Sequence, residues 1–218
     1  MADLTLYITY KNYSSWSLRT WLVMRAFDIP FEEVLVPMMD DCQMPGMDGI
    51  SPTRKVPCLV DHAHDLTIWE SVAIIEYLAE RYPEHAIWPD DLAGRATARA
   101  LVAEMHAGFL SLRAECPMNL RRPTQRLVIG DDARRDVARV KAILADCLAR
   151  SDGPFLTGAF SALDAFYAPL LARITTYQLS DHPAVRAFQA ALATLPAWQE
   201  WHRAALVETT VIKADEIH

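Results

Sequence analysis

The stretch LTLYITYKNYSSWSLRTWLVMRAF (residues 4–27) predicts a strand, a turn and a helix in direct succession. Residues 4–10 are rich in the β-branched and aromatic side chains that form half-buried strands. The three residues that follow interrupt this pattern. Leu18, Trp21 and Leu22 then recur at the spacing of one helix face. We therefore expect a β-strand that leads through a short turn into a helix.

The chain up to residue 83 continues this mixture of strands and helices. Strand patterns occur at 31–36, 56–60 and 66–68, and the apolar spacing over 70–82 predicts a second helix that the next proline ends. Strands and helices in this order form an α/β layer. We assign residues 1–83 to one domain.

The remainder of the chain predicts only helices. Residues 84–90 contain the expected linker. Segments of helical period, rich in alanine, leucine and arginine, follow at 92–120, 132–150, 162–177, 184–193 and 197–206. We therefore expect an all-α second domain over residues 91–218.

One helix start in the second domain carries a recognisable cap. Ser161 and Asp164 fit the pattern in which a hydroxyl and a carboxylate three residues later satisfy free amide groups at a helix N-terminus. We interpret this pair as structural.

The charge balance argues against a nucleic-acid partner. The chain has 21 Lys and Arg against 28 Asp and Glu, a formal net charge of −7, whereas phosphate binding depends on concentrated positive charge. The first 83 residues hold six basic and twelve acidic side chains. No apolar run reaches the length needed to span a bilayer, so we expect no membrane partner.

The cysteines indicate neither a metal site nor a disulfide framework. Cys42, Cys58, Cys116 and Cys147 are scattered, without a CxxC pair or a histidine at metal-ligand spacing. The N-terminus also lacks the basic start and apolar core of an export signal. We expect a cytoplasmic protein that binds no metal.

Ser14 and Ser15 lie between the first predicted strand and the first predicted helix, at the start of that helix. Serine at this position is often an ordinary helix cap. The same place offers free amide donors and the positive end of the helix dipole, so a hydroxyl there can also stabilise an anion such as a thiolate. Both interpretations remain open.

Two further short motifs are candidate ligand sites. Lys55-Val56-Pro57 opens a strand, and a cis Val56-Pro57 bond would turn the Val56 backbone groups outward to pair with an extended peptide. Glu70-Ser71 opens a helix, where Ser71 could bind a carboxylate while Glu70 binds an ammonium group. The structural alternative for Glu70 is an acidic residue that complements the helix dipole.

Two clusters favour a surface interpretation. His62-Ala63-His64 could suggest a metal, but it falls on a polar turn between strands. Four arginines of the second domain, Arg113, Arg121, Arg122 and Arg126, suit a solvated helix face. The alternative is that one or two of them attract a second substrate that carries a carboxylate.

These motifs, in this order, resemble the soluble glutathione S-transferases over nearly the whole chain. The run from Ser51 to Pro57 looks like the family's loop that ends in a cis-proline, and the run from Glu70 to Leu78 looks like its Glu-Ser signature. The resemblance implies a thioredoxin-like N-terminal domain followed by an all-helical domain. Residues 104–122 are similar to a bacterial branch of the family whose substrates are not well defined.

The resemblance also implies the residue that holds the glutathione thiolate. Serine-type members, including the zeta and tau classes, use a hydroxyl at the start of the first helix. Matching from the helix end places this hydroxyl on Ser14, with Ser15 as second choice, whereas matching from the strand side would place it on Asn12. A shifted turn would make Asn12 or Tyr13 the contacting group.

The glutathione-binding residues implied by the resemblance are Lys55, Val56, Pro57, Glu70 and Ser71. Val56 would pair with the cysteinyl backbone, Glu70 and Ser71 would hold the γ-glutamyl end, and Lys55 would contact the glycyl end. Cysteine-type relatives that perform disulfide exchange have Cys where Ser14 stands, so the resemblance disfavours redox chemistry.

The implied function is that of a glutathione S-transferase, in which glutathione is the co-substrate and attacks a small electrophile. A glutathione-dependent cis-trans isomerase, similar to maleylacetoacetate isomerase, would use the same site. A non-enzymatic member that serves as a binding or regulatory module is the third possibility. The family resemblance further implies a role in detoxification and a homodimer.

Overall fold

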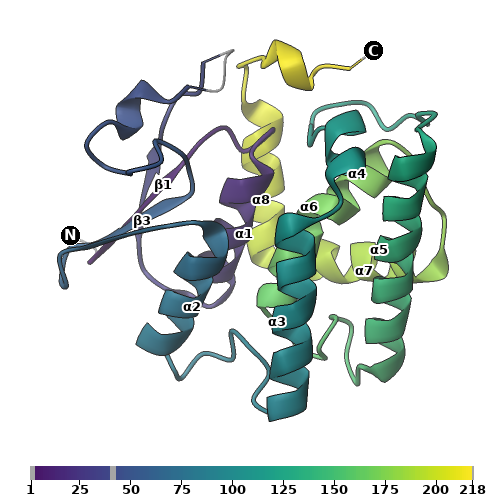
Figure 1. Ribbon diagram of the computed structural model, residues 1–218, viewed down its shortest axis with the longest axis horizontal. Coiled ribbons are helices and arrows are strands. Elements are labelled where there is room, and N and C mark those ends of the chain that lie inside the picture. Colours follow the sequence, from purple (N-terminus) through teal and green to yellow (C-terminus); the bar gives the residue numbers. More distant parts are fainter. Residues whose placement is uncertain (1–2, 40–42, 218) are drawn as a thin grey trace.

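A four-stranded sheet forms the N-terminal part of the computed structural model, which describes residues 3–39 and 43–217 (Figure 1). The strands are β1 (Leu4–Ile8), β2 (Glu32–Leu35), β3 (Cys58–Asp61) and β4 (Leu66–Trp69), in the spatial order β2-β1-β3-β4. β1 pairs parallel to β2 and antiparallel to β3, and β4 is antiparallel to β3. A central strand with partners on both sides explains why β1 is almost fully buried.

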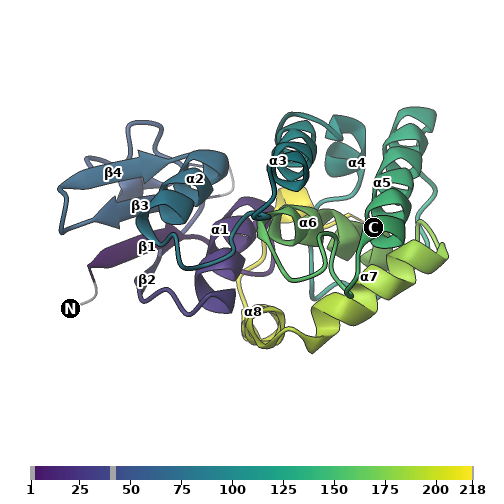
Figure 2. The same ribbon diagram turned by 90° about the horizontal axis from the view of Figure 1, so that it is seen from below.

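Two helices belong to this layer. α1 (Ser15–Ala26) connects β1 to β2, and α2 (Ser71–Arg81) follows β4. A short 3-10 helix (Pro45–Met47) lies in the long connection between β2 and β3. α1 is buried on nearly every side, because it lies between the sheet and the C-terminal helices (Figure 2).

The rest of the described chain is helical. Its helices are α3 (Leu92–Ala107), α4 (Leu110–Glu115), α5 (Asp131–Arg150), α6 (Ala162–Thr176), α7 (Pro183–Thr194) and α8 (Pro196–Val207), with a 3-10 turn at Lys213–Asp215. The predicted fold class is confirmed: an α/β thioredoxin-like N-terminal domain plus an all-α C-terminal domain. The domain boundaries around the linker at 84–90 stay a prediction. No helix of the described residues is long and apolar enough to cross a bilayer.

The prediction of a single helix over residues 92–120 is wrong. The chain forms α3 and α4 instead, which Gly108 and Phe109 separate. Phe109 has a left-handed backbone, with φ of 58°, which a continuing helix does not allow. The backbone also approaches closely here, since a Cβ atom on Gly108 would lie 2.7 Å from the Glu104 carbonyl oxygen. The break turns the chain so that Arg113 of α4 reaches Trp16.

The predicted cap of α6 is confirmed. The buried Asp164 carboxylate accepts hydrogen bonds from the Ser161 N–H at 2.9 Å and from the Leu156 N–H at 2.8 Å. Burial favours the neutral form and raises the pKa of Asp164 to about 6, although these donors favour the carboxylate. The pair therefore joins the start of α6 to the loop that precedes it.

We expect Asp164→Ala to lower the free energy of unfolding by about 2 kcal/mol, at the upper end of the range for lost helix caps, because two buried N–H groups lose their acceptor. Urea unfolding measures this change. Asp146→Ala removes an exposed carboxylate that pairs with Arg150 and is the matched control, with an expected loss below about 1 kcal/mol. Equal losses in the two variants would contradict a capping role for Asp164.

Candidate functional site

A pocket of about 180 Å³ opens where the start of α1, the loop before β3 and the start of α2 meet. Its lining residues are Trp16, Thr53, Lys55, Val56, Pro57 and Glu70. The structure thus brings four of the predicted site residues together from two separate segments. Trp16 and Thr53 were not among the predicted residues.

Glu70 lines the α2 side of this pocket, and Ser71, which does not line it, follows as the first residue of α2. Glu70 precedes the first residue of α2 and has a φ of 70°, a conformation that non-glycine residues rarely adopt and that clusters at ligand sites. Ser71 is fully buried, and its hydroxyl has no hydrogen-bond partner within residues 3–39 and 43–217. A buried donor without an acceptor is costly, so this hydroxyl suits a bound ligand.

The opposite side of the pocket is the Val56-Pro57 segment. The peptide bond between these residues is cis. Val56 precedes β3, whose registered pairs with β1 and β4 begin at Cys58. The Val56 backbone groups therefore lie outside the sheet ladder, next to the pocket.

Ser14 is the N-cap of α1 and does not line the pocket. Its hydroxyl oxygen accepts the Ser17 N–H at 3.2 Å, and its hydroxyl group donates to Ser17 Oγ at 2.8 Å. Ser15 is buried, and its Oγ accepts a hydrogen bond from Arg173 at 3.3 Å. Ser14 is the more exposed of the two hydroxyls and directly precedes the helix that carries Trp16.

The other two candidates for the thiolate contact are occupied by structural hydrogen bonds. The Asn12 side chain is fully buried, donates to Asn119 Oδ1 at 3.0 Å and accepts the Arg121 N–H at 2.8 Å. The Tyr13 hydroxyl donates to Glu216 and accepts from Arg121 at 2.9 Å. Burial and the Glu216 hydrogen bond raise the pKa of Tyr13.

The C-terminal segment supports the turn before α1. The Glu208 carboxylate accepts the backbone N–H groups of Lys11 and Asn12 at 2.7 and 2.9 Å. Arg121 donates to the backbone carbonyls of Glu208 and Thr210 and so holds the segment from the other side. Sequence reasoning missed these contacts, because they join residues 87 to 197 positions apart.

Two arginines and a histidine surround the Trp16 ring. The guanidinium carbons of Arg19 and Arg113 lie 3.8 and 4.8 Å from its centroid, and His106 packs edge-on at 5.1 Å. His106 Nε2 is also 3.8 Å from the Glu70 carboxylate. Arg19 of α1 and Arg113 of α4 thus form a cationic layer next to the pocket, and His106 of α3 packs against the same ring.

The electrostatics of this layer follow from its burial. Arg19 is fully buried, and none of its side-chain nitrogens has a hydrogen-bond partner among the described residues. Burial and the nearby charge of Arg113 lower the pKa of Arg19. Burial and the charge of Arg19 likewise lower the pKa of His106, so this imidazole is neutral at pH 7. An anion beside Trp16 would relieve the repulsion between the two arginines.

The four arginines of the second domain do not form one cluster. Arg113 belongs to the cationic layer, while Arg121 and Arg122 bind backbone carbonyls of the C-terminal segment. Arg126 lines a different cavity with Arg134 and Lys141. Only Arg113 therefore lies near the candidate site.

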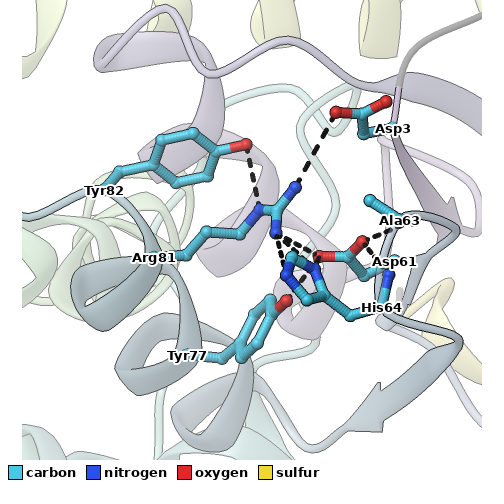
Figure 3. Close-up of polar contacts among 7 residues, drawn as sticks. All are labelled: Asp3, Asp61, Ala63, His64, Tyr77, Arg81 and Tyr82. Atoms are coloured by element: carbon cyan, nitrogen blue, oxygen red, sulfur yellow. Dashed lines mark hydrogen bonds and ion pairs between the residues drawn. The ribbon is translucent and has the colours of Figure 1, made fainter.

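The two histidines between β3 and β4 have structural partners. Figure 3 shows His64 next to the buried Asp61, together with Tyr77 and Arg81. His64 Nδ1 lies 3.2 Å and Arg81 Nη1 lies 2.9 Å from Asp61 Oδ2, to which the Tyr77 hydroxyl also donates. His62 contacts Thr5 instead, at 2.8 Å. No group of three or more potential metal ligands occurs among the residues searched, 3–39 and 43–217.

Asp61 is the acceptor at the centre of this network. Burial of its carboxyl favours the neutral form, but hydrogen bonds from Tyr77 and His64 and the charge of Arg81 outweigh this effect and hold the pKa of Asp61 below its ordinary value. The network joins the β3-β4 turn to α2.

Comparison with known proteins identifies one family model and many relatives. The model described as "Glutathione S-transferase, N-terminal domain" matches residues 13–81. A probable maleylacetoacetate isomerase of Caenorhabditis elegans is 28% identical over 200 residues, which cover 90% of this chain and 92% of the relative. The glutathione S-transferase GstB of Escherichia coli is 28% identical over 203 residues, covering 81% and 93% of the two chains.

Solved structures of glutathione transferase relatives have a similar fold. A maleylacetoacetate isomerase from Anaeromyxobacter dehalogenans, solved with glutathione in its active site, superposes with a TM-score of 0.68 at 27% identity and covers 95% of this chain and 98% of its own. A glutathione transferase homologue from Burkholderia, also with bound glutathione, has a TM-score of 0.70 at 23% identity, with 93% and 97% covered.

We expect Glu208→Ala to loosen the turn before α1, because the N–H groups of Lys11 and Asn12 lose their acceptor. Hydrogen bonds to a charged group contribute about 1.5–3 kcal/mol, so amide exchange over residues 11–14 should accelerate by at least tenfold. Hydrogen–deuterium exchange measures this. Glu200→Ala removes an exposed carboxylate of α8, 3.5 Å from Arg25, and should leave exchange at the turn unchanged. Slow exchange in both variants would contradict the supporting role of Glu208.

We expect Asp61→Asn to destabilise the protein at pH 7 by about 1.5–3 kcal/mol, because the charged acceptor of Tyr77 and Arg81 is lost. A lowered carboxyl pKa stabilises the fold above the unfolded value of about 3.9, and this contribution disappears as the pH falls below it. The deficit of the variant should therefore shrink toward pH 3 in urea unfolding. Asp65→Asn, on the same turn but exposed, is the control and should behave like the parent. A deficit that stays constant with pH would contradict the prediction.

Proposed function

Because this chain belongs to the glutathione S-transferase family, we propose that it binds glutathione in the pocket between Trp16 and Glu70 and activates the thiol for attack on a small electrophile. The observation that carries the proposal is the convergence of Lys55, Val56 and Glu70 on one pocket beside the start of α1. Relatives solved with bound glutathione support the choice of ligand.

The pocket offers a complementary group for each part of the tripeptide. The Glu70 carboxylate suits the ammonium group of the γ-glutamyl end, and the unpartnered Ser71 hydroxyl at the start of α2 suits its carboxylate. The free Val56 backbone suits the cysteinyl amide, and Lys55 suits the glycyl carboxylate. We propose these contacts, with Pro57 shaping the wall between them.

We propose that Ser14 stabilises the thiolate. A thiol with a pKa of about 8.5 is roughly 3% ionised at pH 7, and lowering the pKa by about two units makes it roughly three-quarters ionised. That shift corresponds to about 2.7 kcal/mol. A charge-assisted hydroxyl hydrogen bond of about 1.5–3 kcal/mol and a helix N-terminus of about 0.3–1 kcal/mol together reach this value.

For this step the Ser14 hydroxyl rotates from Ser17 Oγ toward the sulfur. Ser17 Oγ keeps a second partner, since it accepts the Thr9 N–H at 3.3 Å, so the rotation leaves no isolated hydroxyl. The cationic layer adds a favourable charge, because no described residue accepts a hydrogen bond from the Arg19 guanidinium. The reacting sulfur comes from glutathione, and no protein nucleophile or metal is needed in this mechanism.

A glutathione-dependent cis-trans isomerase is the second candidate. It is favoured by the relatives named maleylacetoacetate isomerase, at 27–28% identity over at least 90% of this chain. The thiolate would add to one carbon of a conjugated double bond, rotation would occur about the resulting single bond, and expulsion of the thiolate would restore the double bond. Glutathione is then recovered unchanged, whereas a transferase consumes it. Assaying free thiol during turnover distinguishes the two activities.

A non-enzymatic binding or regulatory protein is the third possibility, and retention on immobilised glutathione together with an inert bound thiol would favour it.

Cys58, Cys116 and Cys147 are free thiols, and burial raises the pKa of each to about 11, which makes them poor nucleophiles. Cys42 lies outside the described residues.

A cytoplasmic homodimer is the family expectation. Cell fractionation would test the location and sedimentation would test the oligomeric state.

We expect Ser14→Ala to raise the pKa of bound glutathione by about one to two units, because the thiolate loses a charge-assisted hydrogen bond. Titration of the thiolate by its ultraviolet absorbance measures this shift. Ser14→Gly is the more informative variant, since glycine keeps most of the capping stability but has no hydroxyl. Ser14→Thr restores the hydroxyl and should restore the pKa.

Ser15→Ala is the matched control, because Ser15 is buried against Arg173 and should not change the pKa of the thiol. A shift in Ser15→Ala without one in Ser14→Ala would move the assignment to Ser15. Failure of the parent to bind immobilised glutathione would overturn the proposed function.

A further inference from the structure

A cleft of about 330 Å³ lies beside α5, at the end of the molecule opposite the sheet (Figure 2). One of its walls is α5, and the other is the segment 126–129, which belongs to no helix or strand. None of its lining residues also lines the pocket between Trp16 and Glu70. The cleft is therefore separate from the proposed glutathione site.

Positive charge lines this cleft. Arg126 reaches it from the segment, and Arg134 and Lys141 reach it from α5, whereas no Asp or Glu is among its lining residues in the described part of the chain. Arg126 is exposed and Lys141 is half-buried, and neither forms a hydrogen bond or an ion pair with a described residue. Arg134 pairs with the exposed Asp131 at 2.5 Å. Exposed pairs contribute little stability, so an incoming carboxylate can replace Asp131.

The spacing of the two cations on α5 suits an extended ligand. Arg134 and Lys141 are two helical turns apart, so their Cα atoms are separated by about 10.5 Å along one face of the helix. Side chains on one face of an extended peptide are about 7 Å apart at two residues and about 13 Å apart at four. Acidic side chains at alternate positions of a peptide can therefore reach both cations. Val137 and Ile129, which are buried, form an apolar floor between the two walls.

The segment 126–129 offers backbone groups as well as charge. The N–H groups of Gln125 and Leu127 donate to carbonyl groups at the end of α6, at 3.0 and 3.1 Å. The N–H groups of Arg126 and Val128 have no acceptor among the described residues. Because alternate backbone groups of an extended chain point in opposite directions, one edge of the segment is paired and the other is open. The Val128 side chain is 84% exposed, so solvent reaches this part of the segment. An added β-strand binds to such an open edge.

We propose that this cleft docks an acidic, extended peptide segment of a partner protein. The peptide backbone pairs with the open edge at Arg126 and Val128, and its carboxylates bind Arg126, Arg134 and Lys141. An inorganic anion would use the charges but would leave the backbone edge and the exposed Val128 unused. A nucleic acid would also use the charges, but the net charge of −7 on the chain repels a long polyanion.

The docking surface goes beyond the proposed function and does not depend on it, because it shares no residue with the glutathione pocket. Isothermal titration with the capped peptide acetyl-Glu-Val-Glu-Val-Glu-amide tests the proposal. We expect one site per chain, and binding that weakens as the salt concentration rises, because salt screens exposed charges. Each titration is run with and without saturating glutathione, which should leave the peptide affinity unchanged.

Three further ligands separate the sources of affinity. The Gln-Val-Gln-Val-Gln counterpart should bind at least tenfold more weakly, since it lacks the charge pairs. The fully N-methylated form of the Glu peptide keeps its charges but has no backbone donors, and it should bind about tenfold more weakly. A short oligothymidylate is the competing polyanion, and it should bind more weakly than the Glu peptide.

Substitutions locate the site. Arg126→Gln and Lys141→Gln should each weaken binding of the Glu peptide about threefold, and about tenfold together, without affecting the Gln peptide. Val128→Pro removes an open N–H that has no described acceptor, and it should weaken binding of the Glu peptide severalfold. Arg135→Gln is the matched control, because Arg135 is an exposed arginine of α5 that pairs with Asp132 outside the cleft. It should bind as the parent does, and thermal unfolding confirms that each variant is folded.

The proposal is overturned if the parent does not bind the Glu peptide, if the Gln peptide or the N-methylated peptide binds equally well, or if the oligothymidylate binds more tightly. It is also overturned if glutathione displaces the peptide, or if the Arg126→Gln, Lys141→Gln double variant binds as the parent does. If Val128→Pro does not fold, the N-methylated peptide tests the same backbone pairing. Because glutathione binding is measured separately, the proposed function can fail while this docking surface survives, and the reverse.

Discussion

The burial of α1 on nearly all sides is the constraint on which the rest of the structure depends. Trp21 is fully buried, donates to Glu33 of β2 at 2.6 Å and packs against Trp201 of α8 with ring centroids 5.1 Å apart. On another side, Arg173 of α6 binds Ser15. One helix therefore contacts the sheet and two helices of the C-terminal part. Because α1 cannot move without disturbing all of them, the backbone at its start has a fixed position.

The sequence predicted the fold class because the signals are local and repeated. Each strand and helix has its own periodicity, and the only large error, the helix over 92–120, arose because helical period alone does not detect the left-handed backbone of Phe109. Lys55, Val56, Pro57 and Glu70 could be grouped from their motifs and do line one pocket. These motifs were sufficient to predict the residues of the pocket, because each motif determines a backbone conformation as well as the identity of a side chain.

The remaining parts of the site could not be predicted, for a physical reason. Glu208 is an ordinary charged residue in sequence, and Arg113 could be named only as one of four clustered arginines. The fold alone places them beside the turn and Trp16. The positive charge beside the pocket also results from the fold. The first 83 residues are strongly acidic, yet a buried Arg19 from this part and an arginine from α4 meet at one aromatic ring. Average charge therefore does not describe the field that a bound anion would experience.

The contacts of Glu208 determine when, during synthesis, the turn before α1 can reach its final geometry. Lys11 leaves the ribosome well before its acceptor, which follows 197 positions later. At about 5–20 residues per second, the turn waits roughly 10–40 s for that carboxylate. The sheet can pair and α1 can form meanwhile, while the N–H groups of Lys11 and Asn12 remain in water. The nascent protein thus acquires the final geometry of its α1 turn only after Glu208 has been made, when most of the helices that surround this turn already exist.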